Sequence, residues 1–335
     1  MSRTAHALWL REPGSGEIRS LDLPEPGAGE VLVRTLVSGV SRGTETLVFR
    51  GGVPESQYAA MRAPFQDGTF PAPVKYGYLN VGVVETGPDD LRGRTVFCLY
   101  PHQTAYVVPV EAVSVVPADL PPRRAVLAGT VETAVNALWD ARPLVGDRAA
   151  VVGAGMVGLC VTRLLARIPG VTVTVVDTDP SRAEVAEAFG ARFARPGDAP
   201  DDLDVVVHAS GTAAGLQLSL DLLAADGVVT DLSWYGDTPV RLELGGRFHS
   251  DRLGIRASQV GEVARARRGR RTRGDRTALA LRLLADPAFD ALLTGESEFE
   301  ELPEVMGKLA SGSIPALCHT ITYPALDAAD SPGTR

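Results

Sequence analysis

The sequence predicts an α/β protein with two domains, a β-rich domain followed by a doubly wound parallel sheet. The chain has 335 residues, whereas a single hydrophobic core usually stops growing at about 250–300 residues. Short strand-forming runs separated by turn residues occupy the first part of the chain. From Arg148 onward, strand-like runs alternate with helix-like runs, which is the pattern of parallel βαβ units.

Residues 1–118 are expected to form the β-rich domain. Its strand-forming runs are AHALWL, GEVLVRTLVSGV, VGVVETG, RTVFCLY and TAYVVPV. Residues 49–78 contain many prolines and glycines, which predicts a long loop, and loops of this length are usually functional or disordered. Pro121 and Pro122 begin an amphipathic segment, which predicts a helix that leads into the second domain.

Residues 119–279 are expected to form the doubly wound domain. Predicted strands are VTVTVVD, DVVVHASG, GVVTDLSW and RLGIRASQV, and predicted helices between them are SRAEVAEAFG and GLQLSLDLLA. Residues 276–292 and 299–311 predict two further helices. The run ALCHTITYP predicts a last strand, and residues from about 280 to 335 are expected to complete the first domain.

A glycine-rich turn at the start of the second domain predicts a dinucleotide site. The run AAVVGAGMVGLCVTRLL reads as a strand, a turn and a helix, with the pattern G-x-G-x-x-G. Gly153 permits the tight turn, Gly155 lets the backbone approach a pyrophosphate, and Gly158 lets the helix pack on the strand. The helix N-terminus then presents free N–H groups and a partial positive charge to the phosphates.

Asp177 ends the second strand, nineteen residues after Gly158. A carboxylate at this place binds both hydroxyls of the adenosine ribose and repels a 2′-phosphate, so NAD(H) is predicted rather than NADP(H). Ser210 and Gly211 follow another strand and are expected to border the cofactor, whereas His208 is expected to be a packed residue. The predicted cofactor-binding residues are Gly153, Gly155, Met156, Val157, Gly158, Asp177, Thr133, Ser210 and Gly211.

Composition excludes several function classes. The formal net charge of −8 argues against nucleic acid or an anionic membrane as a partner. The three cysteines have no paired spacing, which is typical of reduced thiols in a cytoplasmic protein. The N-terminus has no apolar stretch typical of a signal peptide, and no apolar run approaches the roughly 18 residues of a membrane span.

The chain resembles the medium-chain dehydrogenase/reductase family, which includes the zinc-type alcohol dehydrogenases. The resemblance is carried by GEVLVRTLVSGVSRGTE, PVKYGYLNVGVVE, the GAGMVG turn, and the closing pair FEELPEVMGKLASG and ALCHTITY. It covers nearly the whole chain and implies a GroES-like catalytic domain, a Rossmann domain and a C-terminal return to the first domain. It also implies a homodimer formed by edge strands of the Rossmann sheet, for which Asp237 to Gly246 is the candidate strand.

The sequence departs from the zinc-dependent members of this family. The zinc ligands of those members correspond most nearly to Arg42, Tyr78 and Gly129 in this chain. These three residues together do not form a plausible set of zinc ligands. The cysteine-rich lobe that holds a structural zinc is also absent. The chain is therefore expected to belong to a zinc-less branch with no bound metal.

Without zinc, hydride transfer still needs a side chain that gives or takes a proton at the reacting oxygen. Tyr78 either donates that proton or only fills the space of the metal, and Arg42 either holds an anionic group or pairs with Glu45. Glu132 is a candidate general base or a charge that complements a helix N-terminus. His102 is a candidate acid/base or a structural residue. Tyr78 and Glu132 are expected on opposite sides of a cleft between the domains, and Thr133 is expected to contact the nicotinamide carboxamide.

The predicted function is a zinc-independent NAD(H) oxidoreductase that interconverts a secondary alcohol and a ketone on a small polar or heterocyclic metabolite. One alternative is an enoyl or quinone reductase that uses NADPH, against which Asp177 argues. Another is a redox-neutral enzyme or sensor that keeps NAD tightly bound.

Overall fold

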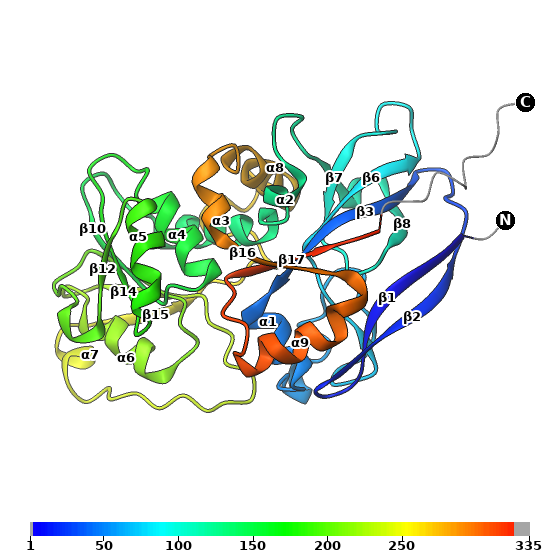
Figure 1. Ribbon diagram of the computed structural model, residues 1–335. Coiled ribbons are helices and arrows are strands. Elements are labelled where there is room, and N and C mark those ends of the chain that lie inside the picture. Colours follow the sequence, from blue (N-terminus) through cyan, green and yellow to red (C-terminus); the bar gives the residue numbers. More distant parts are fainter. Residues whose placement is uncertain (1–2, 325–335) are drawn as a thin grey trace, which may run out of the picture. The chain divides into compact units, whose positions relative to one another are not determined.

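The computed structural model describes residues 3–324 and divides into two compact units (Figure 1). The first comprises Met1–Val116, Pro121–Val126 and Thr294–Arg335, and the second comprises Pro117–Leu120 and Leu127–Leu293. The end of the segment that was expected to complete the first domain, residues 325–335, lies outside the described residues. Within residues 3–324, no helix is long and apolar enough to cross a membrane.

Antiparallel sheets make up most of the first unit, which confirms the predicted β-rich domain. One sheet has the strand order β2-β1-β5-β4, and the other has the order β16-β17-β3-β6-β7-β9, with β8 also paired to β3. The strands are β1 (Arg3–Glu12), β2 (Ser15–Leu23), β3 (Glu30–Ser41), β4 (Asp67–Gly68), β5 (Val74–Lys75), β6 (Asn80–Thr86), β7 (Thr95–Cys98), β8 (Ala105–Pro109), β9 (Val113–Val115), β16 (Leu293–Glu298) and β17 (Cys318–Thr322). The helices are α1 (Arg42–Phe49), α2 (Pro122–Ala125) and α9 (Leu302–Ser311), with 3-10 turns η1 (Glu55–Gln57), η2 (Val110–Ala112) and η7 (Phe299–Glu301).

Strand β3 positions the polar residues of the first unit. Alternate residues of β3 are buried up to Val37, as expected for a strand with one face on the core. Every residue from Ser38 to Ser41 is buried, because β17 pairs with this end and the end of α2 packs over it. A Cβ on Gly39 would lie 3.1 Å from Cys318 Sγ and 3.3 Å from Val126. Polar side chains at this end therefore lie in dry, tightly packed surroundings.

The second unit contains one parallel sheet with the order β12-β11-β10-β13-β14-β15, which confirms the predicted doubly wound class. The chain first moves outward from β10 and then returns to its other side, so the strand order reverses between β10 and β13. The strands are β10 (Arg148–Val152), β11 (Thr172–Val176), β12 (Arg192–Ala194), β13 (Val205–His208), β14 (Val228–Asp231) and β15 (Gly254–Ala257). The helices are α3 (Ala128–Ala141), α4 (Met156–Leu165), α5 (Ala183–Ala188), α6 (Ala213–Asp221), α7 (Arg247–Ser250) and α8 (Arg273–Leu283), with 3-10 turns η3 (Pro180–Arg182), η4 (Pro196–Asp198), η5 (Arg265–Arg267) and η6 (Pro287–Leu292).

The prediction of an edge strand at Asp237 to Gly246 is wrong, because this segment is irregular. Its alternating apolar residues Val240 and Leu242 pack against the core cluster that includes α6. The backbone N–H of Glu243 donates to the side chain of Gln217 rather than to a strand. The outermost strand on this side of the sheet is β15, which pairs only with β14 in the sheet.

Candidate functional site

The glycine-rich turn joins β10 to α4 as the sequence predicted. Gly153 has φ of +109°, and a Cβ on it would lie 2.6 Å from the backbone nitrogen of Ser210. A Cβ on Gly158 would overlap the carbonyl oxygen of Gly153. Only glycine therefore lets the turn lie against β13 and lets α4 pack against the turn.

Gly155 is the N-cap of α4, and it leaves room for a ligand. No atom lies within 4 Å of the position that its Cβ would take. The first N–H groups of a helix have no partner inside the helix, and Gly155 has no side chain with which to cap them. The backbone N–H groups of Met156 and Val157 are among these donors, so the turn fits a pyrophosphate.

Asp177 lies beside this turn, directly after β11. Its Oδ2 accepts a hydrogen bond of 2.6 Å from the backbone N–H of Ala154, and its Oδ1 accepts one of 2.9 Å from that of Asp179. Next to it, the backbone N–H of Asp177 donates to Ala194, which lines a surface depression. The other residues of this depression are Arg192, Phe193, Arg195 and Asp198. Two backbone N–H groups thus hold the Asp177 carboxylate beside the turn, and Arg192 and Arg195 line the neighbouring depression.

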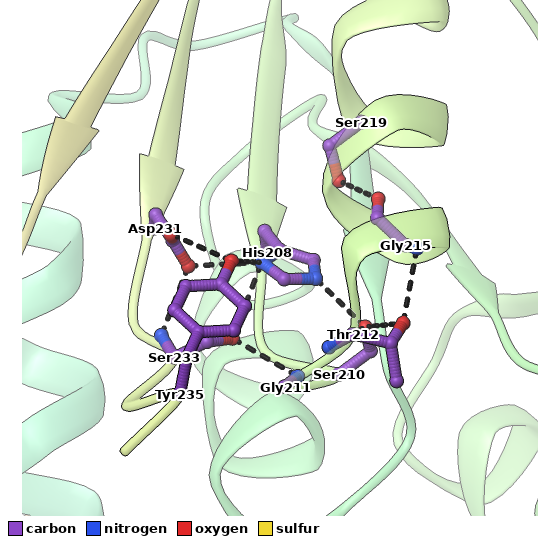
Figure 2. Close-up of polar contacts among 9 residues, drawn as sticks. All are labelled: His208, Ser210, Gly211, Thr212, Gly215, Ser219, Asp231, Ser233 and Tyr235. Carbon is purple, nitrogen blue, oxygen red and sulfur yellow. Dashed lines mark hydrogen bonds and ion pairs between the residues drawn. The ribbon is translucent and has the colours of Figure 1, made fainter. Parts of the chain in front are cut away.

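A buried histidine lies at the carboxyl ends of β13 and β14 (Figure 2). The Nδ1 of His208 lies 2.9 Å from Asp231 Oδ1, and its Nε2 lies 2.7 Å from the Oγ of Ser210. Tyr235 donates to Asp231 Oδ2 at 2.9 Å. His208 is buried as predicted, but the sequence analysis missed Asp231, which lies within the predicted strand GVVTDLSW, and Tyr235, which directly follows that strand.

Glu132 lies on α3 and forms a buried ion pair. Its Oε1 lies 2.8 Å from a terminal nitrogen of Arg276 on α8, and the two side chains are 3% and 1% exposed. Arg276 also donates to Asn136 Oδ1 at 2.6 Å. Burial raises the pKa of Glu132, and the positive charge of Arg276 opposes this shift. On the same helix, Thr133 donates its hydroxyl hydrogen to the carbonyl of Gly129 at 2.9 Å. Neither Arg276 nor Asn136 carried a sequence signal.

A buried polar cluster forms in the first unit from Ser38, Glu45, His102 and Tyr323. The Nε2 of His102 lies 2.9 Å from Glu45 Oε2, and its Nδ1 lies 2.7 Å from Ser38 Oγ. Ser38 Oγ lies 2.8 Å from the hydroxyl of Tyr323. Glu45 Oε1 accepts the backbone N–H of Ser41 at 2.7 Å. The Glu45 carboxylate accepts a hydrogen bond from Nε2 of His102 and thereby orients the imidazole toward Ser38.

Tyr78 adjoins this cluster. A Cβ on Gly77 would lie 2.9 Å from the ring of His102, so the chain passes directly against the histidine just before Tyr78. Burial raises the pKa of the Tyr78 phenol, and the charge of Glu45 raises it further, so Tyr78 is a neutral hydrogen-bond donor. Arg42 begins α1 and is partly buried. Within the described part of the chain, the carboxylate of Glu45 pairs with His102 and not with Arg42.

Of the predicted proton-handling residues, the structure therefore brings Tyr78 and His102 together, with Arg42 one turn before Glu45. Glu132 belongs to the other unit. Sequence reasoning missed Glu45 as a site residue and missed Ser38 and Tyr323 entirely. Over residues 3–324, no group of three or more His, Cys, Asp or Glu side chains is arranged to hold a metal ion.

No family model matches the chain. Its fold nevertheless resembles solved dehydrogenases over nearly the whole length. L-idonate 5-dehydrogenase from Escherichia coli K-12 has a TM-score of 0.77 at 15% identity, over 96% of this chain and 99% of that one. The alcohol dehydrogenase RspB from Escherichia coli CFT073, solved with NADH, has 0.76 at 16% identity, over 95% and 99%. A protein described as a zinc-binding dehydrogenase from Sinorhizobium meliloti 1021, bound to NADP, has a TM-score of 0.76 at 18% identity, over 96% of this chain and 99% of that one.

These likenesses establish the fold class. The chain shares the fold of these solved dehydrogenases and has a β-rich N-terminal unit and a six-stranded parallel sheet. Since one of these structures holds NADH and another holds NADP, the fold by itself does not select between the two cofactors.

Proposed function

We propose that the chain is a zinc-independent NAD(H) oxidoreductase that interconverts a secondary alcohol and a ketone on a small polar or heterocyclic metabolite. The observation that carries this proposal is the open space in front of α4 at Gly155, with Asp177 held beside it. The cofactor, when bound, supplies or takes the hydride. The predicted set of residues around it is Gly153, Gly155, Met156, Val157, Gly158, Asp177, Thr133, Ser210 and Gly211.

We assign proton transfer to and from the reacting oxygen to residues of the first unit. Tyr78 keeps its hydrogen because burial and Glu45 raise the pKa of its phenol, so it suits donation of a hydrogen bond to a carbonyl oxygen. His102 lies between the Ser38 hydroxyl and the Glu45 carboxylate and is placed to relay a proton. Arg42 is the candidate for an anionic group of the substrate. Glu132 remains a candidate general base, although its carboxylate is paired with Arg276.

Cofactor preference tests the proposal most directly. Asp177 should make NADH bind more tightly than NADPH, because its carboxylate accepts hydrogen bonds from ribose hydroxyls and repels a phosphate. Calorimetric or fluorescence titration of the purified protein with both cofactors measures this difference. Equal or tighter NADPH binding would contradict it and would favour the alternative of an NADPH-dependent enoyl or quinone reductase, with Arg192 and Arg195 in the adjoining depression as the phosphate-binding residues.

A second experiment separates net oxidoreduction from a redox-neutral role. We expect bound cofactor to exchange with NADH in solution and to be consumed with a ketone substrate. Cofactor that stays bound through purification and shows no turnover with any alcohol or ketone would instead favour a sensor or an internal redox cycle. The described cysteines Cys98, Cys160 and Cys318 are buried and form no disulfide with one another, which supports the proposed cytoplasmic location.

A further inference from the structure

We infer, on the basis of the cofactor site proposed above, that Arg276 and Asn136 are positioning residues for the nicotinamide half of the dinucleotide. They fix the backbone of residues 258–264, the loop that follows β15, so that this loop lines that half of the site. Asn136 lies on α3 and Arg276 lies on α8, and each residue is 1% exposed. All of these residues belong to the second unit.

The guanidinium of Arg276 joins the 258–264 loop to α3. Its Nη2 donates to the backbone carbonyl of Val260 at 2.5 Å, and its Nη1 donates to that of Glu262 at 3.2 Å. Nη1 also donates to Asn136 Oδ1 at 2.6 Å, and Nε and Nη2 lie 2.9 Å and 2.8 Å from Oε1 of Glu132. The five N–H groups of this arginine therefore have five contacts with acceptors, and two of these acceptors are loop carbonyls.

Asn136 holds the same loop at two further backbone groups. Its Oδ1 accepts the backbone N–H of Ala264 at 2.9 Å in addition to the hydrogen from Arg276. The amide nitrogen consequently faces the backbone carbonyl of Gln259, to which it donates at 3.4 Å. These roles do not depend on a protonation state, because a guanidinium only donates, a carbonyl only accepts, and the amide oxygen must face the two donors.

Glu132, Asn136 and Asp140 form a polar stripe on α3, since residues four apart lie on one face of a helix. Asp140 Oδ2 accepts the hydroxyl hydrogen of Ser258 at 2.7 Å, at the start of the loop. Apolar side chains of similar volume would pack α3 against α8 about as well as a buried ion pair does. The polar side chains instead supply partners for backbone groups that lie outside helices and sheets, and so fix the path of the loop.

The topology of the parallel sheet places this loop on the nicotinamide side of the proposed site. Dinucleotides bind across the carboxyl ends of such strands, with one nucleotide on either side of the reversal in strand order. Asp177, proposed for the adenosine ribose, follows β11, whereas the loop follows β15 on the other side of that reversal. Thr130, in the first turn of α3, donates to Sδ of Met156 at the start of α4 at 3.7 Å. The helix that holds the loop therefore also contacts the end of the glycine-rich turn.

Amide hydrogen exchange on the whole chain, measured by mass spectrometry, tests the position of the loop. NADH should slow exchange in residues 258–264 by about 3-fold or more, because the bound nicotinamide half restricts opening of the loop. ADP, which lacks the nicotinamide riboside, should slow exchange at the glycine-rich turn, residues 153–158, and not in the loop.

Substitution tests the positioning role, with binding as the readout because Glu132 is also a candidate general base. Asn136→Ala should weaken NADH binding about 5- to 10-fold, the scale of one lost hydrogen bond, and leave ADP binding within about 2-fold. The double variant Glu132→Leu/Arg276→Met exchanges the buried ion pair for apolar side chains, so it should fold and still lose NADH affinity alone. Should Asn136→Ala fail to fold, the double variant and the exchange experiment decide.

A matched control is Asp286→Asn, which removes an ion pair with Arg163 elsewhere in the second unit and should bind both ligands normally. The inference alone is overturned if NADH does not slow exchange in the loop, if NADH affinity is unchanged in the folded variants, or if ADP affinity falls equally. The same loss of NADH affinity in Asp286→Asn would also overturn it. If the unaltered protein binds neither NADH nor ADP, the proposed function fails as well.

Discussion

At Tyr78, burial and a neighbouring carboxylate act in the same direction, and both keep the phenol protonated. The carboxylate of Glu45 is held in turn by His102 and by the backbone N–H of Ser41. Each of these contacts joins residues that are buried or partly buried, so water competes weakly for the hydrogen bonds. The chemistry of this unit thus depends on single atoms whose donor and acceptor roles are set by their neighbours.

Replacement of Tyr78 by phenylalanine should lower kcat by about 10²-fold or more and leave NADH affinity nearly unchanged, since only the hydroxyl group is removed. Steady-state kinetics with a responsive ketone, together with NADH titration, measures both quantities. Tyr76→Phe, at a buried tyrosine two residues before it in the sequence, is the matched control and should keep near-normal turnover. Normal turnover of Tyr78→Phe would move the role to His102 or Arg42.

Among the elements, the turn between β10 and α4 contains three glycines, and a Cβ on each of them would meet different surroundings. Gly153 and Gly158 face backbone atoms, whereas Gly155 faces open space. A second junction, between α3 and α8, depends on the ion pair of Glu132 with Arg276. These contacts allow folding and function to be separated by substitution.

Gly155→Ala should leave the unfolding free energy nearly unchanged, because its Cβ meets no atom within 4 Å, but should weaken NADH binding at least 10-fold, because the methyl group takes the space of the pyrophosphate. Gly158→Ala should instead lower the unfolding free energy by about 1–3 kcal/mol through overlap with Gly153. Urea unfolding and NADH titration distinguish the two. Gly197→Ala, at an exposed and uncrowded glycine, is the control for both assays.

Glu132→Gln should lower the unfolding free energy by about 3–5 kcal/mol, because it leaves the buried guanidinium of Arg276 without a negative partner. Glu262→Gln, which removes an exposed carboxylate from a surface pair with Arg273, should change it by less than about 1 kcal/mol. Turnover of the folded Glu132→Gln protein then tests the general-base hypothesis, which requires a loss of about 10²-fold with NADH affinity unchanged. Near-normal turnover would leave Glu132 with the structural role alone.

For the molecule as a whole, the residues at the predicted zinc-ligand positions bear on metal content, and the edge of the parallel sheet bears on self-association. The sequence analysis predicts Arg42, Tyr78 and Gly129 at the positions of the zinc ligands of the zinc-type alcohol dehydrogenases. The outer strand β15 has Ile255 exposed on an edge that pairs on one side only in the described sheet. The residues at the predicted zinc-ligand positions lead to a prediction about zinc content, and the edge strand β15 leads to a prediction about the oligomeric state.

Purified protein should contain far less than one zinc per chain and should keep its activity in a chelator. The reason is that Arg42 carries a positive charge and Gly129 has no side chain, so neither binds Zn²⁺. Elemental analysis by mass spectrometry measures the content. About one zinc per chain, with activity lost on chelation, would refute the zinc-independent assignment.

The protein should be a homodimer at micromolar concentration, formed through β15 and not through residues 237–246. An unpaired edge strand favours pairing with a two-fold related copy. Light scattering should give twice the mass of 35.3 kDa, and Ile255→Lys should shift the protein toward the monomer. Arg256→Lys, which keeps the charge of the same strand, is the control, and a monomeric unaltered protein would count against the hypothesis.

The sequence by itself determined the fold class and the position of the glycine-rich turn. Both depend on local patterns, since glycine spacing and the alternation of strands and helices are set by neighbours in the chain. Gly153, Gly155, Gly158 and Asp177 could therefore be placed in the turn and after the second strand before the structure was known, and their roles toward a cofactor stay predictions. The same local reasoning misread Val240 and Leu242 as an edge strand, because alternation does not reveal what a side chain packs against.

Only the tertiary structure decided which polar groups meet. His102 lies 57 residues from Glu45 in sequence, and Ser38 lies 285 residues from Tyr323, yet each pair is within hydrogen-bond distance. The sequence likewise did not predict the hydrogen bond between His208 and Asp231, which lie 23 residues apart. Hydrogen bonds depend on atoms brought together by sheet pairing and burial, and a single sequence carries no measure of those distances. The donor and acceptor roles that define this chemistry were therefore set by the fold and not by any motif.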